Sequence, residues 1–417
     1  MSANMESLFD GLTVLELGHV IAAPFAASLI GDFGAQVIKI EDPGSGDMLR
    51  GSGPRKDGVH LWWKSAARNK SSVAIDLRLP EGQALVRKMV ERADVVIENF
   101  RPGTLERWGL GWEELHAANP RLIMLRISGY GQIGPESAKP GYGRVGEAMS
   151  GAVHITGHPD RPPTHFGFSL GDVTTGIMGA FAVAGALFKR EAIGNRFDGE
   201  CIDLALYESL FRGIDWQVIL YDQLNYVAER QGNQFQVSPS PVSDTYLSCD
   251  GVWYTVATGT VRSVQSLLEL LGGTTLRNDP KYATQELQML HREELGEMVR
   301  QWFAENNSDI VEKACASSGV VAARIFTPAE MFSSPTFAAR ESLVEVADQE
   351  LGPVRVTGVV PRLTNFPGSV RSTGPRLGIH GQEVLTEWLG LADSEYEALV
   401  SSGVVGAVDV DGEVPGH

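Results

Sequence analysis

A single aspartate stands at the head of a long apolar stretch, SLGDVTTGIMGAFAVAGALFKR, residues 169–190. The apolar residues predict a buried helix. Lys189 and Arg190 close it, since cations favour the negative, C-terminal end of a helix dipole. At the start of that helix Asp172 can cap free backbone N–H groups, and the dipole also favours its ionised form. An ionised carboxylate held in a fixed direction can act as a nucleophile. The segment therefore leaves two roles open for Asp172, a structural cap and a covalent catalyst.

The composition limits the class of protein and its partners. The chain has 417 residues, enough for two or three domains, and its 35 basic and 52 acidic residues give a net charge of −17. No run of lysine and arginine occurs, which argues against nucleic acid and membrane surfaces as partners. Cys201, Cys249 and Cys315 are far apart, which disfavours a disulfide framework. The first residues lack the pattern of a signal peptide, so we expect a soluble, cytoplasmic protein.

The first 200 residues alternate short strand-like and helix-like segments. Strands are predicted at 13–17, 36–41, 72–77, 94–100 and 121–131, and helices at 22–34, 80–93 and 104–119. This rhythm predicts an α/β fold with a Rossmann-like, doubly wound parallel sheet and helices on both faces. Ligands bind at the carboxyl ends of such strands, so the loops EDPGSGD, ENFRPG and SGYGQ should border one crevice.

The pattern changes after about residue 225. Residues 243–258 predict two strands joined by a turn at Asp250-Gly251, and helical segments follow to about residue 318. Extended, proline-rich sequence returns at 351–375. We therefore expect an inserted smaller α+β domain. The predicted large domain covers 1–220, the small domain covers 225–325, and a C-terminal part, 330–417, returns to the large domain.

Several common chemistries lack their motifs. The first predicted strand is followed by GHVIAAPFA instead of G-x-G-x-x-G, so the glycine-lined turn of a dinucleotide site is absent. No G-x-S-x-G nucleophile elbow occurs. His154, His158 and His165 lie among glycines and prolines that cannot form one helix face. We expect no metal site.

Four segments, at 11–50, 67–82, 93–135 and 171–190, together resemble the class III CoA-transferase family. The resemblance implies an interlocked homodimer whose subunits each have a large Rossmann-like domain and a small domain. It implies no permanently bound cofactor, since coenzyme A and acyl-CoA are substrates. It also implies that Asp172, in the motif G-D-x-x-x-G, attacks an acyl-CoA thioester and forms first a mixed anhydride and then an aspartyl-CoA thioester. A carboxylic acid would then collect the CoA.

The resemblance also implies roles for residues near the ends of the predicted strands. The implied CoA-binding residues are Val20, Ile75, Arg78, Asn99, Phe100 and Arg107. Arg78 stands where the family has a lysine. The implied substrate pocket includes His19, Ile21, Tyr142 and Gly171. Ile21 replaces a glutamine of formyl-CoA transferase, which makes the pocket less polar and argues against strict formyl or oxalate specificity.

Three functions remain open at this point. An intermolecular CoA-transferase is favoured. An isomerase of the α-methylacyl-CoA racemase type, or one that moves CoA within a diacid, would share the fold and Asp172. The racemase needs a second acid–base group, and Tyr142 stands where the family supplies a histidine. A tyrosine has an ordinary pKa near 10 and is a poor base at neutral pH. A non-catalytic CoA-binding protein would tolerate loss of Asp172.

Overall fold

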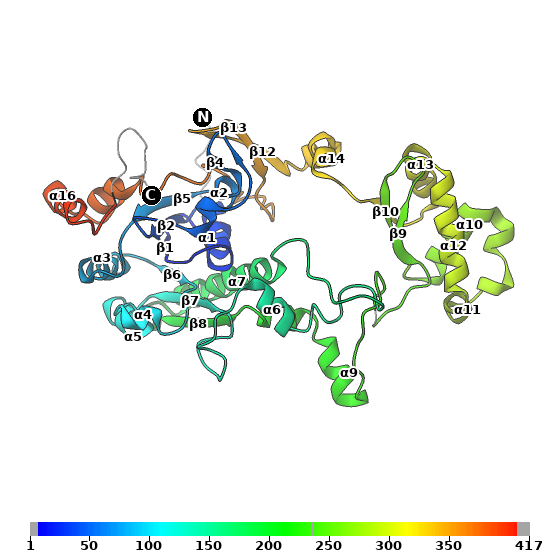
Figure 1. Cartoon of the computed structure of the whole chain (residues 1–417), viewed down its shortest axis with the longest axis horizontal. Coiled ribbons are helices and arrows are strands. Elements are labelled where there is room, and N and C mark those ends of the chain that lie inside the picture. The colour runs from blue at the N-terminus through cyan, green and yellow to red at the C-terminus, as the bar shows by residue number, and fades with distance from the viewer. Residues whose placement is uncertain (1–6, 236, 407–417) are drawn as a thin grey trace. The chain divides into compact units, whose positions relative to one another are not determined.

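The computed structural model describes residues 7–235 and 237–406 (Figure 1). Contacts divide the chain into two compact units. Of the described residues, the first unit comprises 7–152, 166–214 and 336–406. The second comprises 153–165 and 215–335. Residues 153–165, which the sequence analysis placed in the large domain, thus pack with the second unit.

The first unit is built on a six-stranded sheet in which every neighbouring pair of strands is parallel. Its strands are β1 (Thr13–Glu16), β2 (Gln36–Glu41), β5 (Lys70–Ala74), β6 (Val95–Glu98), β7 (Ile123–Ser128) and β8 (Glu200–Ala205). Their order is β5-β2-β1-β6-β7-β8. The predicted parallel sheet is confirmed. The strand order reverses between β1 and β6, and a crevice opens at the carboxyl ends of two such strands.

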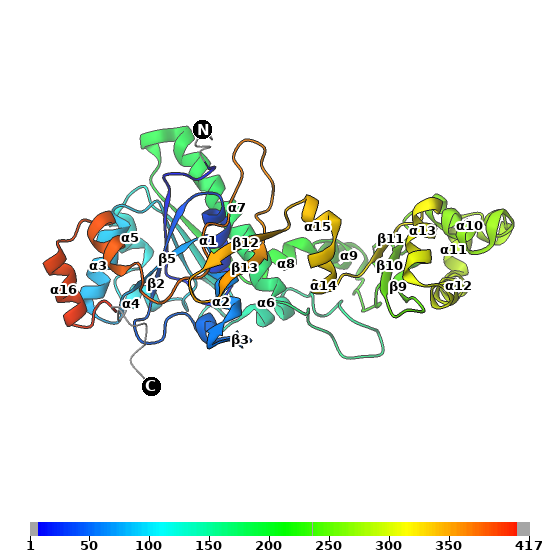
Figure 2. The same ribbon diagram turned by 90° about the horizontal axis from the view of Figure 1, so that it is seen from above.

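Helices cover both faces of this sheet (Figures 1 and 2). One face packs on α1 (Ala22–Asp32) and α7 (Leu170–Ile193). The other packs on α3 (Pro80–Val90), α4 (Thr104–Arg107), α5 (Trp112–Ala118), η4 (Glu383–Trp388) and α16 (Asp393–Ser401). Adjacent residues of β1 point to opposite faces, since Val14 packs with α1 and α7 and Leu15 packs with α3 on the other side. Both faces are therefore apolar, as a buried parallel sheet requires.

The long helix α7 is apolar but is buried on one side only. Its buried side carries small residues, including Thr175, Gly176 and Gly179, and packs on α1 and β7. Phe181 and Phe188 on its other side are 73% and 77% exposed. The prediction that this helix is buried all round is therefore wrong for the single chain. Among the described residues, the segment 170–196 is the one helix that is long and apolar enough to cross a membrane. A core helix can have the same length and composition, and α7 packs closely on α1, so these properties alone do not indicate a membrane-spanning helix.

Shorter elements complete the first unit. They are η1 (Met48–Gly51), β3 (Arg55–Lys56), β4 (Val59–His60), α2 (Leu61–Ala66), α6 (Gly143–Met149), η2 (Gly194–Arg196), α8 (Glu208–Gly213), β12 (Leu343–Asp348) and β13 (Gly352–Thr357). The single helix predicted at 104–119 is two helices, because Gly109 adopts a left-handed conformation, φ +61°, between them. The proline-rich region after 351 contains β13 and otherwise little regular structure up to 375.

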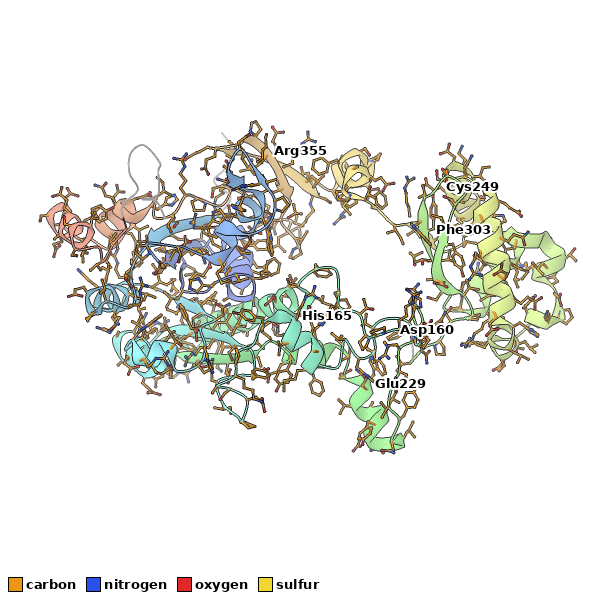
Figure 3. The ribbon with its side chains drawn as sticks, in the orientation of Figure 1. Asp160, His165, Glu229, Cys249, Phe303 and Arg355 are labelled. Carbon is orange, nitrogen blue, oxygen red and sulfur yellow. The ribbon has the colours of Figure 1, made fainter. Side chains whose placement is uncertain are left out.

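The second unit combines a small sheet with several helices. Its elements are α9 (Trp216–Leu224), β9 (Ser243–Leu247), β10 (Trp253–Ala257), α10 (Val261–Arg277), η3 (Pro280–Tyr282), α11 (Gln285–Leu290), α12 (Arg292–Glu305), α13 (Ser308–Ser318), β11 (Ala322–Arg324) and α14 (Pro328–Ser333), and the short α15 (Pro335–Ala339) follows. The predicted hairpin is confirmed, since β9 and β10 pair antiparallel around Asp250-Gly251. Phe303 of α12, labelled in Figure 3, faces this sheet. Its ring stacks on Tyr246 of β9 with ring centroids 5.4 Å apart, which helps to hold the helices on the sheet.

Candidate active site

Asp172 lies in the first turn of α7 but does not cap the helix. Ser169 is the N-cap residue, and no side-chain hydrogen bond caps this end. Among the described residues, none donates a hydrogen bond to the Asp172 carboxylate. The sequence prediction of a capping role is therefore wrong. A half-buried carboxylate whose oxygens are left without donors is available to react with a ligand.

The electrostatic environment of Asp172 also differs from the prediction. Burial, and then the negative charge of Glu147, raise the pKa of Asp172 to about 6. Glu147 is itself buried in α6, where its Oε1 accepts a hydrogen bond from the backbone N–H of Gly171 at 3.1 Å. The helix dipole does not outweigh these two effects, so the pKa is raised where the dipole alone would lower it. Asp172 remains mostly ionised at pH 7 and is a stronger base than an exposed aspartate.

Glycines allow the close approach of α6 and α7 at this point. A Cβ atom at position 143 would lie 2.1 Å from Oδ2 of Asp172, so the carboxylate rests directly on the backbone of Gly143. A Cβ at position 171 would lie 2.9 Å from the carbonyl oxygen of Gly143. Farther along α7, a Cβ at position 176 would lie 2.9 Å from the carbonyl oxygen of Ala22 in α1. Helix contacts at glycine thus fix where the carboxylate stands.

Asp172 lines a cavity of about 620 Å³ that lies wholly within the first unit. The other residues that line it follow the carboxyl ends of the strands or lie on α6 and nearby loops: His19, Val20, Ile21, Ala22, Asp42, Ser45, Gly46, Met48, Asn99, Phe100, Arg101, Ile127, Ser128, Gly129, Gly141, Tyr142, Gly143, Arg144, Ser169 and Leu206. The prediction that three strand-end loops border one crevice is confirmed. The cavity is large enough to hold part of a cofactor-sized ligand.

A buried ion network shapes the loop between β1 and α1. Lys39 donates to Glu16 at 2.6 Å and to the Gly18 carbonyl at 2.8 Å, and its ammonium lies 2.8 Å from Asp47. Asp47 in turn accepts a hydrogen bond from the backbone N–H of Val20 at 3.1 Å. Val20 has φ +65°, which is strained for a β-branched residue and is held only by such contacts. The loop that carries three cavity residues is therefore rigid.

Asn99 fixes the same loop from the side of β6. Its Oδ1 accepts from the backbone N–H of His19 at 2.7 Å, and its amide nitrogen donates to the His19 carbonyl at 2.8 Å. The His19 ring meets Phe100 edge-on, with centroids 5.2 Å apart. Burial, and then the charge of Lys39, lower the pKa of His19, so its imidazole is neutral at pH 7. Asn99 therefore links the loops that follow β1 and β6, the two strands between which the strand order reverses.

The structure brings seven of the eleven predicted site residues to the cavity: His19, Val20, Ile21, Asn99, Phe100, Tyr142 and Asp172. Gly171 is buried just behind Asp172. Ile75 lies in the core, 1% exposed, so its side chain does not reach the cavity. Arg78 pairs with Asp76 and with the cavity residue Asp42, which puts it beyond the rim. Arg107 is exposed and donates to Thr104 at 3.1 Å.

Sequence reasoning missed several residues of the site. Glu147 and Asp47 gave no signal, because a buried carboxylate cannot be told from an exposed one by its neighbours in the chain. Arg144 lines the cavity two positions after Tyr142, in a segment that the resemblance covers only at Tyr142. Among the described residues, no group of three or more His, Cys, Asp and Glu side chains is placed to hold a metal ion. The arrangement suits covalent chemistry at a carboxylate.

Comparison with known proteins agrees with this geometry. The profile of CoA-transferase family III matches residues 9–381. The chain is 43% identical to a succinyl-CoA–D-citramalate CoA-transferase of Chloroflexus aurantiacus, over 95% of this chain and 98% of that protein. It is 34% identical to a succinate–glutarate CoA-transferase of Agrobacterium fabrum, over 92% and 96%. The crystal structure of a CAIB/BAIF family protein from Brucella suis has a TM-score of 0.81 at 32% identity and covers 92% of this chain and 99% of that one.

The chain therefore belongs to CoA-transferase family III, the class that the resemblance in its sequence implied. It is an enzyme, and it transfers coenzyme A between an acyl-CoA and a carboxylic acid.

Proposed function

We propose that this enzyme moves CoA from succinyl-CoA to a second carboxylic acid, with Asp172 as the covalent catalyst. One observation carries the proposal. The Asp172 carboxylate opens on the cavity, receives no hydrogen bond from the described residues, and is fixed by glycine contacts. A nucleophile needs free lone pairs and a fixed direction, and this carboxylate has both.

The reaction is four acyl transfers without net proton uptake. The Asp172 carboxylate attacks the thioester carbonyl, the C–S bond breaks, and CoA thiolate leaves behind a mixed anhydride. The thiolate attacks the Asp172 acyl carbon, which releases the donor acid and leaves an aspartyl-CoA thioester. The acceptor carboxylate attacks the carbonyl of this thioester, the C–S bond breaks, and CoA thiolate leaves behind a second mixed anhydride. The returning thiolate then attacks the acceptor carbonyl, giving the new acyl-CoA and the free Asp172 carboxylate.

The cavity supports the binding of CoA at the carboxyl ends of β1 and β6. The loop 18–21 and the pair Asn99–Phe100 lie on the two sides of the strand-order reversal, where open α/β sheets bind ligands. Succinyl-CoA is the donor named for relatives that share 36–43% of their residues with this chain over 95% of its length. The apolar side chain of Ile21 suits a donor with a carbon chain more than it suits oxalate.

An interlocked homodimer is the assembly that we propose. The exposed apolar side of α7 supports it. Phe181 and Phe188 lie about one and about three helical turns after Ile177, so the three exposed side chains form one stripe. A stripe of this kind is normally covered by another surface. Sedimentation analysis should give the mass of two chains, and Phe181→Asp should shift it toward one.

The test of the mechanism is mass spectrometry of the intact protein after incubation with acyl-CoAs. We expect an acyl or CoA adduct that maps to Asp172, reacts with hydroxylamine and is absent in Asp172→Ala. Asp203→Ala serves as a matched control and should still form the adduct. Asp203 is an exposed residue of the edge strand β8, and its carboxylate accepts a hydrogen bond from the Gln132 backbone N–H. CoA binding without any adduct would overturn covalent transfer. Exchange of α-protons in deuterated water would then support the isomerase, the second candidate from the sequence.

A further inference from the structure

The cavity contains one cation that the described part of the chain leaves unpaired. His19 is neutral at pH 7 because burial lowers its pKa, and Arg101 donates to the Ala138 carbonyl. Arg144 lines the same cavity, and no ion pair or hydrogen bond among the described residues involves it. An arginine that lines a cavity and is not paired with an anion is suited to bind an anionic group of a ligand.

Arg144 is also placed on the acyl side of the reaction. The Asp172 carboxylate rests on Gly143, the residue before Arg144 at the start of α6. The Cα atoms of Gly143 and Arg144 lie about 3.8 Å apart, as in any pair of consecutive residues. The phosphates of CoA lie a whole pantetheine arm away from the thioester that Asp172 attacks. A cation one residue from the backbone that supports the nucleophile is therefore nearer to the acyl group than to the phosphates.

The guanidinium of Arg144 does not pair with the nucleophile itself. The pKa of Asp172 is raised by burial and by Glu147, and no nearby cation opposes that shift. Both residues line the same cavity of about 620 Å³, which has room for a short acyl group. The two carboxyl carbons of a succinyl group are three C–C bonds apart, at most ~4 Å. One end of such a group can thus lie at Asp172 while the other lies within reach of a long arginine side chain.

We propose that Arg144 binds the distal carboxylate of a dicarboxylic acyl group and so selects dicarboxylic over monocarboxylic thioesters. The inference rests on the proposed function, because it assigns a binding role at the site where Asp172 acts. The planar guanidinium can make two parallel hydrogen bonds to a carboxylate, which a methyl group at the same position cannot accept. Arg144 binds substrate and takes no part in bond making.

The experiment compares succinyl-CoA with butyryl-CoA, which has the same chain length and a methyl group in place of the carboxylate. The rate of adduct formation at Asp172 is measured in single turnovers without acceptor, at thioester concentrations below saturation. We expect the wild type to prefer succinyl-CoA and Arg144→Gln to lower this preference by about 10- to 100-fold, the value of a charged hydrogen bond. Arg144→Lys should keep part of the preference. Arg101→Gln, the matched control in the same cavity, should keep the wild-type ratio.

Each result distinguishes the inference from the proposed function. If Arg144→Gln slows both thioesters equally, Arg144 holds the CoA end or the fold, and the inference is wrong while covalent transfer stands. An unchanged ratio, or a wild type without preference, also overturns the inference alone. If the wild type forms no adduct with any thioester, the proposed function fails and the inference falls with it.

Discussion

The carboxylate of Asp172 rests on the bare Cα of Gly143, where any Cβ would stand 2.1 Å from Oδ2. We therefore expect Gly143→Ala to displace the nucleophile without removing it. A misplacement of about 1 Å can lower the rate on the order of 100-fold. The measurement is kcat/KM for CoA transfer. Gly213→Ala in α8, where an added Cβ meets no atom within 4 Å, is the control and should transfer CoA at the wild-type rate. Full activity in Gly143→Ala would show that the carboxylate has room to move.

The acid limb of the pH profile should report Asp172. Because burial and Glu147 raise the pKa of Asp172 to about 6, we expect kcat/KM to fall as the pH drops below about 6. Removing the charge of Glu147 by Glu147→Gln should move this limb to lower pH, and by less than the whole shift, since burial is the larger cause. A limb near pH 4 in the wild type would contradict this account.

Asp172 should reduce the stability of the folded protein at neutral pH. Its pKa is about 6 in the folded chain against 3.8 in the unfolded chain, so the folded state binds the proton more tightly. Its contribution is most favourable below pH 4 and is lost as the pH rises through 6. We expect Asp172→Asn to raise the free energy of unfolding by ~1–3 kcal/mol at pH 7.5 and by less at pH 5. Urea denaturation at both values measures this. Equal gains at both would indicate a packing effect.

Asp47 should be essential to the loop that carries Val20. Asp47→Ala removes the acceptor of the Val20 N–H and leaves Lys39 with one carboxylate fewer in a buried site. Loss of one partner from a buried ion network costs about 3–5 kcal/mol. Asp47→Asn keeps the acceptor and loses only the charge, so we expect a smaller loss. The free energy of unfolding and the KM for acyl-CoA should change together if Asp47 acts through the loop. A change in stability with an unaltered KM would separate the two.

The repeating pattern of the first half made the sheet predictable. Buried strands such as VVIE at β6 consist mainly of apolar residues with high β-propensity, and short connections separate the strands from the helices. Element ends were less certain. The strand predicted at 72–77 lies at 70–74. It includes Lys70, which is buried in an ion pair with Glu16, and the sequence does not show that this pair forms.

The site was predictable where a residue follows a strand and less so where the environment decides. Asn99 and Phe100 follow β6 directly, and strand ends converge in a parallel sheet. The raised pKa of Asp172 depends on burial and then on Glu147, which lies near it because glycines bring α6 and α7 together. Arg78 and Ile75 do not line the cavity, since a salt bridge holds one and the core packs around the other, and their roles in CoA binding stay predictions.

The two walls of the cavity differ in how firmly they are built, and this has an evolutionary consequence. The wall that carries Asp172 belongs to a 24-residue helix packed on α1, so substitutions there would disturb the core. The adjoining wall is the start of the seven-residue helix α6, where positions 142 and 144 are exposed. Selection can therefore alter the second wall while the first stays unchanged, so one transfer reaction can acquire new acids without losing its chemistry.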